Sequence, residues 1–254
     1  MMASSPRLLI KTSAKNRATA GFTLIEMLVS LAILVTVTGA IFEQINSMQK
    51  KSASEAVNVD LTQQARDFIN QTVRDLHMAG YPAASMYSVD PSAHPSLVAN
   101  RLVRVSPTEI LLEGDVNNDG TVESVDIVYL KSDSNDPNCP CIRRSAQPKI
   151  DASSFSQGIN PIYTDTQQVF PPGTDPGQSG EDLFAYYDQN GNPVPIGSGV
   201  DISTPATSTT QSGQALISSI KTVKINLTLL TTQRDPQTGN FVRTSMSASA
   251  RLSN

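Results

Sequence analysis

The chain has 254 residues and a net charge of −4, so it is long enough for one sizeable domain and a membrane anchor. Four of its 19 Lys and Arg residues and none of its 23 Asp and Glu residues lie within 1–21, which leaves the remainder with 15 basic and 23 acidic residues and a net charge of −8. An acidic remainder excludes general electrostatic binding of nucleic acid or anionic lipid. The chain also has no Trp, only two His and two Cys, and no Gly-x-Ser-x-Gly, phosphate-binding Gly loop or His-Glu-x-x-His motif, so the sequence predicts that it is not an enzyme.

The most informative feature is a single charge inside an apolar run. The run starts at Gly21 and continues to Phe42, and roughly 20 apolar residues can cross a bilayer as a helix. Its one charge is Glu26. A carboxylate at membrane depth costs about 2.5–3.5 kcal/mol, so we expect Glu26 to have a partner and a function. The basic segment before the run predicts a cytoplasmic N-terminus, with the rest of the chain translocated.

The stretch Gly21-Phe22-Thr23-Leu24-Ile25-Glu26 resembles the leader junction of the type IV prepilin family. The resemblance implies that a prepilin peptidase removes residues 1–21 by cutting between Gly21 and Phe22, that the new amine of Phe22 is methylated, and that Glu26 takes part in filament assembly. The alternative is an uncleaved signal anchor, which would leave Glu26 without a purpose. An ordinary secretory signal is disfavoured because no Ala-x-Ala site follows the run.

The residues after the junction predict one long helix over 22–80. This segment contains no Pro and a single internal glycine, Gly39, and a helix of that length extends roughly 85–90 Å. Residues 22–42 form the transmembrane part or filament core. Further on, apolar residues recur at spacings of three and four, which predicts one face packed on a globular head. These residues are Ile45, Met48, Leu61, Ala65, Phe68, Ile69, Val73 and Leu76. The residues expected to face outward are Lys50, Lys51, Arg66 and Asp67.

The helix is predicted to end at Gly80, because a Gly followed by Pro82 is a stop signal. The stretch 74–81, Arg-Asp-Leu-His-Met-Ala-Gly-Tyr, is similar to the corresponding part of the PilW group of minor pilins and of the J-type pseudopilins of type II secretion.

Residues 81–254 are predicted to form a β-rich head. Strand-like runs cover 109–112, 125–130 and 183–187, and 217–230 forms a hairpin with 241–252. Alternation of apolar residues from Val223 onward indicates an antiparallel sheet with one buried face. Segments 146–180 and 188–214 are expected to be exposed loops. The predicted fold class is therefore α+β and pilin-like: a long N-terminal helix packed on an antiparallel β-sheet head with long loops.

One loop has the ligand spacing of a calcium site. Over 115–126, oxygen-bearing side chains stand at positions 1, 3, 5, 9 and 12, with Gly at position 6. The expected ligands are Asp115, Asn117, Asp119 and Asp126 through their side chains, Thr121 through its carbonyl, and Glu123 directly or through water. The pattern resembles the calcium loop of EF-hands, and its final Asp resembles the dockerin version. The alternative is a plain hairpin turn, because the flanks are strand-like and Asn-Asn-Asp-Gly is itself a turn sequence.

The two cysteines, Cys139 and Cys141, are separated by one residue. Outside the cytoplasm, paired thiols are expected to form a disulfide. Free thiols, pairing with another chain and a redox role are the alternatives. No His lies near them in sequence, so they do not predict a zinc site.

Together these features favour a minor pilin of the PilW type, which is an assembly subunit of a type IV pilus or of its tip. A J-type pseudopilin of type II secretion is the alternative, and DNA-uptake systems use related subunits. A membrane-tethered calcium-binding or adhesive module is a further alternative. The expected partners are other pilins or pseudopilins, the prepilin peptidase and the inner-membrane assembly platform, with no specific nucleic acid. No cofactor is expected to be required, and Ca²⁺ is the one candidate ion. The expected location is the bacterial inner membrane, with the head outside the cytoplasm, and later the pilus or pseudopilus.

Overall fold

The structure is a computed structural model that describes residues 21–86, 95–132, 139–149, 163–169, 182–202 and 208–252. The predicted leader therefore lies outside the described residues, apart from Gly21. The chain divides into two compact units, Met1–Gln49 and Lys50–Asn254, and each is described here by itself.

The first unit consists of the N-terminal part of a long helix, α1 (Leu24–Met78), whose remainder belongs to the second unit. Its bounds agree with the helix predicted over 22–80 to within two residues at each end. The side chains from Leu24 to Phe42 are exposed, and the most apolar 18-residue window has a mean hydropathy of 2.3. By length and composition, this helix can cross a membrane.

In the second unit, one stripe of α1 is buried at helical spacing, as the sequence predicts. The buried residues are Ser54, Leu61, Ala65, Phe68, Ile69, Thr72, Asp75 and Leu76. The stripe begins later than predicted, because Ile45 and Met48 are 44% and 70% exposed. The four charged residues that we expected to face outward do so: Lys50, Lys51, Arg66 and Asp67.

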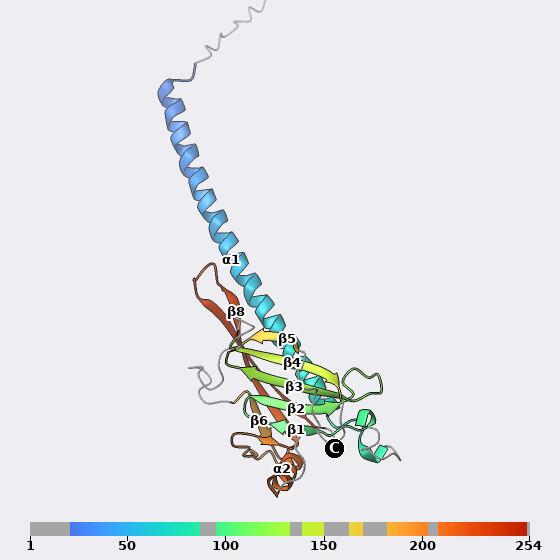
Figure 1. The fold of residues 1–254 in the computed structure, drawn as a ribbon. Coiled ribbons are helices and arrows are strands. Elements are labelled where there is room, and N and C mark those ends of the chain that lie inside the picture. The colour runs from blue at the N-terminus through green and yellow to red at the C-terminus, as the bar shows by residue number, and fades with distance from the viewer. Residues whose placement is uncertain are drawn as a thin grey trace, which may run out of the picture. The chain divides into compact units, whose positions relative to one another are not determined.

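A six-stranded antiparallel sheet forms one layer of the second unit, in the order β5-β4-β3-β2-β1-β7. Figure 1 shows β5 to β1 side by side in this order. The strands are β1 (Leu102–Val105), β2 (Glu109–Gly114), β3 (Glu123–Leu130), β4 (Cys141–Pro148), β5 (Tyr163–Gln168) and β7 (Val200–Asp201). The predicted strands at 109–112 and 125–130 are β2 and β3, which pair directly with each other.

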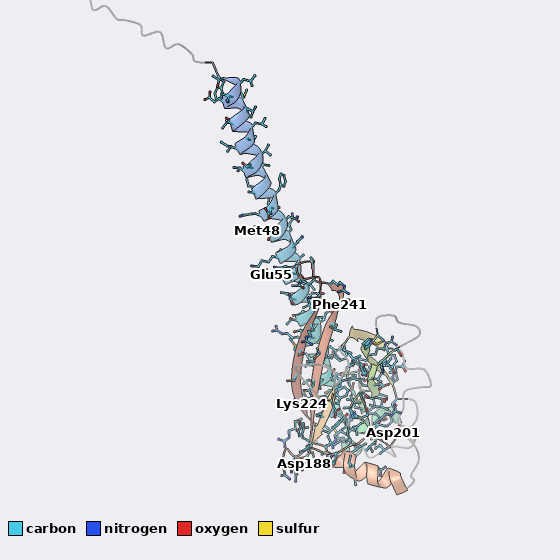
Figure 2. The ribbon with its side chains drawn as sticks, turned by 90° about the vertical axis from the view of Figure 1, so that its left-hand side faces the viewer. Met48, Glu55, Asp188, Asp201, Lys224 and Phe241 are labelled. Carbon is cyan, nitrogen blue, oxygen red and sulfur yellow. A yellow bond between two sulfur atoms is a disulfide. The ribbon has the colours of Figure 1, made fainter. Side chains whose placement is uncertain are left out.

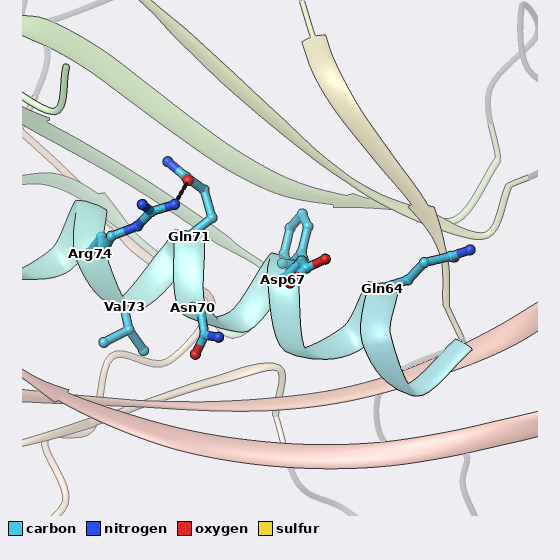
Figure 3. Close-up of a pocket in the computed structure, with 7 residues that line it drawn as sticks. Gln64, Asp67, Asn70, Gln71, Val73 and Arg74 are labelled. Carbon is cyan, nitrogen blue, oxygen red and sulfur yellow. Dashed lines mark hydrogen bonds between the residues drawn. The ribbon is translucent and has the colours of Figure 1, made fainter. Parts of the chain in front are cut away.

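A three-stranded antiparallel sheet forms the second layer, in the order β6-β8-β9. Its strands are β6 (Phe184–Tyr187), β8 (Thr222–Arg234) and β9 (Phe241–Arg251). A bridge from Val169 to Leu229 connects the two sheets. The buried stripe of α1 belongs to the same apolar cluster as residues of both sheets, and Figure 3 shows the helix from Gln64 to Arg74 with strands near it. The apolar core lies among these three layers, so the long apolar helix and antiparallel sheets confirm the predicted α+β, pilin-like fold.

Some element bounds differ from the prediction. Residues 217–219 do not start the last hairpin, because they end a second helix, α2 (Ser208–Ser219). Gly213 permits this helix to pack closely against β7, since a Cβ there would lie 2.8 Å from Cγ1 of Val200. The segments predicted as loops also contain regular elements. These are the end of β4 and all of β5 within 146–180, and β7 with the start of α2 within 188–214. β1 is a further strand that was not predicted.

Two contacts fix the C-terminal part of α1 to the six-stranded sheet. Gly114 on β2 crosses the end of the helix, where any Cβ would lie 2.4 Å from the carbonyl oxygen of Met78, so only glycine fits. Asp75 and Arg144 form a buried ion pair between α1 and β4, with Nε to Oδ2 at 2.6 Å and Nη2 to Oδ1 at 3.1 Å. Burial raises the pKa of Asp75, and the Arg144 guanidinium opposes that rise.

Candidate functional site

The start of α1 brings the predicted processing and assembly residues together. Gly21 and Phe22 precede the helix, and the Phe22 side chain is 71% exposed. The Thr23 side-chain oxygen accepts a hydrogen bond from the backbone N–H of Glu26 at 3.3 Å, and the Thr23 carbonyl accepts from the same N–H at 3.1 Å. Thr23 is therefore the N-cap, and Glu26 lies in the first turn.

This position explains how an isolated helix can carry Glu26. Negative charge is favourable near a helix N-terminus, because the unpaired N–H groups and the helix dipole are positive there. The next described acidic residue along the chain is Glu43, beyond the apolar run. The exposed surface from Leu24 to Phe42 therefore has one charge, close to its N-terminal end. Such a surface can lie in a lipid bilayer or pack against other apolar helices, and its one carboxylate can pair with one cation.

Thr23 caps the start of α1, and the sequence analysis gives it no role of its own. Its signal is the pattern Thr-x-x-Glu before an apolar run, which is typical of a capping box at a helix start. The Thr23 hydroxyl accepts a hydrogen bond from the backbone N–H of Glu26. This bond fixes where the helix begins and therefore where along the helix the Glu26 carboxylate lies.

Comparison with known proteins agrees with this geometry. Residues 16–42 match the prokaryotic N-terminal methylation motif, which covers the junction, Glu26 and the apolar helix. The match supports a type IV prepilin-like family and a pilin or pseudopilin type of function, and it indicates a structural protein rather than an enzyme. With the apolar helix, it supports membrane anchoring, a pilus-type location and interaction with a prepilin peptidase and pilus or pseudopilus components. A search of curated proteins and a search of solved structures gave no match.

The loop between β2 and β3 is folded around its own carboxylates. Asp115 accepts backbone N–H bonds from Asp119 and Gly120 at 3.0 Å each, and Asp119 accepts from Thr121 at 2.8 Å. The Asn117 amide nitrogen donates to Asp119 at 2.9 Å and to Glu123 at 3.1 Å. Five of the six predicted ligand residues thus share one loop, with an amide N–H between two of its carboxylates.

Asp126, the sixth predicted ligand, does not join the loop. It lies on β3 opposite Leu111 and Ser145, and its Oδ2 accepts a hydrogen bond from the Tyr163 hydroxyl at 3.2 Å. Burial, followed by the nearby charge of Glu109, raises the pKa of Asp126 to about 6. Because β3 begins at Glu123, an extended backbone carries Asp126 about 10 Å past the loop.

The loop offers suitable atoms for Ca²⁺ without a finished set of ligands. Nowhere in the described ranges do three or more His, Cys, Asp or Glu side chains form a group that could hold a metal ion. The pKa of Glu123 is nevertheless raised, first by burial and then by the charges of Asp119 and Asp115. The three carboxylates therefore repel one another, and a cation at the loop would relieve that repulsion.

Cys139 and Cys141 are joined by a disulfide at the start of β4. Cys141 is fully buried and lies opposite Gln168 of β5, which is the edge strand of the six-stranded sheet. The disulfide therefore closes a small ring beside that edge.

A groove of about 730 Å³ lies along α1 and is drawn in Figure 3. Gln64, Asp67, Asn70, Gln71 and Arg74 line it, and Arg74 donates a hydrogen bond to Gln71. The lining of the groove contains amides and charged groups but no nucleophile paired with a base. The groove is thus a mixed polar and apolar surface of the helix, which also includes Phe68 and Val73, and it adds no chemistry to the site at the start of α1.

Proposed function

We propose that this protein is a minor pilin of the PilW type, processed by a prepilin peptidase and incorporated into a type IV pilus or its tip. The observation that carries the proposal is the placement of Glu26 one turn after the Gly21–Phe22 junction, in a helix that otherwise exposes only uncharged residues as far as Phe42. Cleavage at the junction would free the amine of Phe22 near this carboxylate.

The proposed mechanism is assembly. In a membrane, the apolar helix of each subunit is solvated by lipid tails. In a filament core, other subunits' helices replace the lipid, and Glu26 would face the N-terminal amine of a neighbouring Phe22. Exclusion of water strengthens this attraction, although desolvation of both groups opposes it. The ion pair would therefore align the subunits more than it would tighten their packing.

A J-type pseudopilin of type II secretion is the second candidate, and the end of α1 favours it equally. Residues 74–81 resemble both groups, and in this structure they fix the helix to the head. Leu76 and Ala79 are fully buried, and Gly80 has a positive φ of 84°. The stretch therefore supports a shared head architecture, while Glu26 supports assembly in either system.

Processing is the first expected result. Full-length precursor produced with a prepilin peptidase should be cut between Gly21 and Phe22, and the new Phe22 amine should be methylated. Intact mass and N-terminal analysis of membrane-extracted protein measure both changes. The Gly21→Leu variant should remain uncut, because a large side chain replaces hydrogen at the scissile junction. A mature chain that starts at Met1, or beyond Phe42, would contradict the proposal.

We also propose that the loop from Asp115 to Glu123 binds Ca²⁺ weakly and that the ion stabilises the head. The arrangement that supports this is the mutual repulsion of Asp115, Asp119 and Glu123 around the Asn117 amide. Rotation of that amide would turn its oxygen toward the ion. The Thr121 carbonyl would complete the set, and Asp126 would stay in its contact with Tyr163.

Addition of 5 mM Ca²⁺ to residues 50–254 should raise the thermal midpoint by about 3–8 °C over chelator, as expected for a dissociation constant of about 10⁻⁴–10⁻³ M. Asp119→Ala should abolish the rise. In chelator, the contribution of Glu123 to stability should fall as pH rises above about 4.5, because its raised pKa means that this group binds more protons in the folded state than in the unfolded state in that window. Ca²⁺ should remove this fall.

The matched control is Asp188→Ala. Asp188 also accepts backbone N–H bonds in an exposed turn, from Asn190 and Asn192 at 2.8 Å each, but it belongs to no carboxylate cluster among the residues that the structure describes. This variant should lose a little stability and keep the full response to Ca²⁺. An equal midpoint with ion and with chelator in the unsubstituted protein would leave the loop as a plain hairpin turn.

A further inference from the structure

An amine, an amide and a carboxylate meet at one buried oxygen in the head. This oxygen is Oε2 of Glu113, near the end of β2, and it accepts a hydrogen bond from Nζ of Lys149 at 2.8 Å. It also accepts from the side-chain Nδ2 of Asn100 at 3.0 Å and from the backbone N–H of that residue at 2.8 Å. Asn100 precedes β1 and Lys149 follows β4, so the two donors come from strands that β2 and β3 separate in the sheet.

This meeting point is shielded from water. The side chains of the head are densely packed (Figure 2), and among them Glu113 is fully buried and Lys149 is 6% exposed. Oε1 of Glu113 is buried and has no hydrogen-bond partner among the described residues. A buried carboxylate with an unpaired oxygen is costly, so transfer of a proton from the ammonium to the carboxylate would replace two buried charges by two neutral groups. The resulting amine would have a free electron pair and still have two N–H groups for its other contacts.

Backbone hydrogen bonds hold the three residues in place. The N–H of Glu113 donates to the carbonyl of Asn100 at 3.1 Å, and the N–H of Lys149 donates to the carbonyl of Val122 at 2.9 Å. Nζ of Lys149 also donates to the carbonyl of Val98 at 3.0 Å. Two atoms that each lie about 3 Å from one oxygen are within about 6 Å of each other, so side-chain rotations can bring Nζ to the amide carbon. Groups fixed in this way react without the entropy cost of a bimolecular encounter.

We propose that Lys149 and Asn100 form an isopeptide bond within the chain, with Glu113 as the acid and base. Lys149 first gives one proton to Glu113, and its amine then attacks Cγ of Asn100. The new Nζ–Cγ bond forms while Glu113 gives its proton to Nδ2 and takes up one from Nζ. The Cγ–Nδ2 bond breaks, and ammonia leaves. Because an amine and an amide give an amide and ammonia, the reaction needs no oxidant, reductant or further reactant.

Ammonia would have a path to solvent, because Asn100 is only half-buried and lines a surface groove of about 500 Å³. The bond would connect the start of β1 to the end of β4 across β2 and β3. A covalent link between segments distant in sequence restricts the unfolded chain and thereby stabilises the folded head, as a disulfide does. The inference does not depend on filament assembly through Glu26, because it concerns only the head.

The test is the mass of full-length protein, produced without a prepilin peptidase and purified in detergent, then reduced and unfolded before measurement. The protein should be about 17 Da lighter than its sequence requires, because one molecule of ammonia is lost. Digestion should yield one branched peptide in which Asn100 is joined to Lys149. The full mass after prolonged incubation of the folded protein would overturn the proposal and leave a buried ion pair.

Variants that each remove one participant separate the isopeptide bond from other losses of ammonia. Asn100→Ala removes the amide and Lys149→Met removes the amine, so both should retain the full mass. Glu113→Gln keeps the size of the side chain but should slow the reaction about a hundredfold, since it cannot take up and return a proton. A loss of ammonia that persists in Lys149→Met would indicate cyclisation of an asparagine onto its own backbone and contradict the proposal. If the Lys149 and Glu113 variants do not fold, Asn100→Ala and the branched peptide decide.

The matched control is Asn117→Ala. The Asn117 amide also donates to carboxylates, to Asp119 at 2.9 Å and to Glu123 at 3.1 Å, but the hydrogen bonds of this loop among the described residues include no lysine side chain. This variant should therefore lose ammonia as completely as the unsubstituted protein does. If Asn117→Ala retained the full mass, the ammonia would come from the loop, and the proposal would be wrong.

Discussion

Glu26→Ala should insert into the membrane at least as well as the unsubstituted protein and yet be lost from filaments. The variant removes a carboxylate that costs about 2.5–3.5 kcal/mol at membrane depth, so anchoring gains. It also removes the group that we propose faces the Phe22 amine of a neighbouring subunit. Complementation of a strain that lacks the protein, followed by quantification in sheared filaments and in membranes, measures both effects. We expect at least a tenfold loss from filaments with an unchanged membrane level.

Three variants separate charge from helix stability. Glu26→Gln keeps the size of the side chain and should fail as Glu26→Ala does. Thr23→Ala removes the cap from the start of α1, which costs about 1 kcal/mol, but it keeps the carboxylate and should assemble at a reduced level. Glu43→Ala changes an exposed acid beyond the apolar run and should be neutral. Normal assembly of Glu26→Ala would favour the membrane-tethered module over the pilin.

The sequence predicted α1 and the β2–β3 and β8–β9 pairs because their patterns are long and local. The stripe from Leu61 to Leu76 repeats at helical spacing over four turns, and alternation from Val223 onward continues through most of β8. Signals of this kind add up over many residues. The resemblance at Gly21–Glu26 added what periodicity cannot supply, namely a purpose for the charge.

The elements that escaped prediction depend on contacts between distant segments. α2 is rich in Ser and Thr, which are weak helix formers, yet it buries Gly213, Ile217 and the following Ile220. Arg101 is 116 to 119 residues away in sequence and donates to the carbonyls of Ile217, Ser218 and Ile220 at the end of this helix. No local pattern contains such a contact.

The loop from Asp115 to Glu123 shows the same limit within a candidate site. Spacing alone placed Asp126 at the twelfth position of a loop, because an EF-hand continues into a helix there. In this chain β3 has already begun at Glu123, so Asp126 follows the direction of a strand and contacts Tyr163. The first nine positions do share one loop, as the spacing predicts, and the strand that follows them decides where the last residue lies.

The Asp75–Arg144 pair should have the largest effect on the stability of the head. Asp75→Ala leaves the Arg144 guanidinium buried without its carboxylate, and removal of one partner of a buried ion pair costs about 3–5 kcal/mol. Chemical unfolding of residues 50–254 measures this loss. Asp67→Ala is the control on the same helix, because Asp67 is exposed and accepts a hydrogen bond only from Gln63 among the described residues; it should cost no more than about 0.5 kcal/mol.

The double variant Asp75→Leu with Arg144→Met should recover much of the loss, since an apolar pair of similar volume avoids the desolvation of two charges. Burial is also the largest influence on the pKa of Asp75 and raises it. The folded state therefore binds more protons than the unfolded state just above pH 3.8, and this group's contribution to stability falls as pH rises through that window. The double variant should lack that part of the pH dependence. Equal stability of Asp75→Ala and Asp67→Ala would show that the pair does not fix α1 to β4.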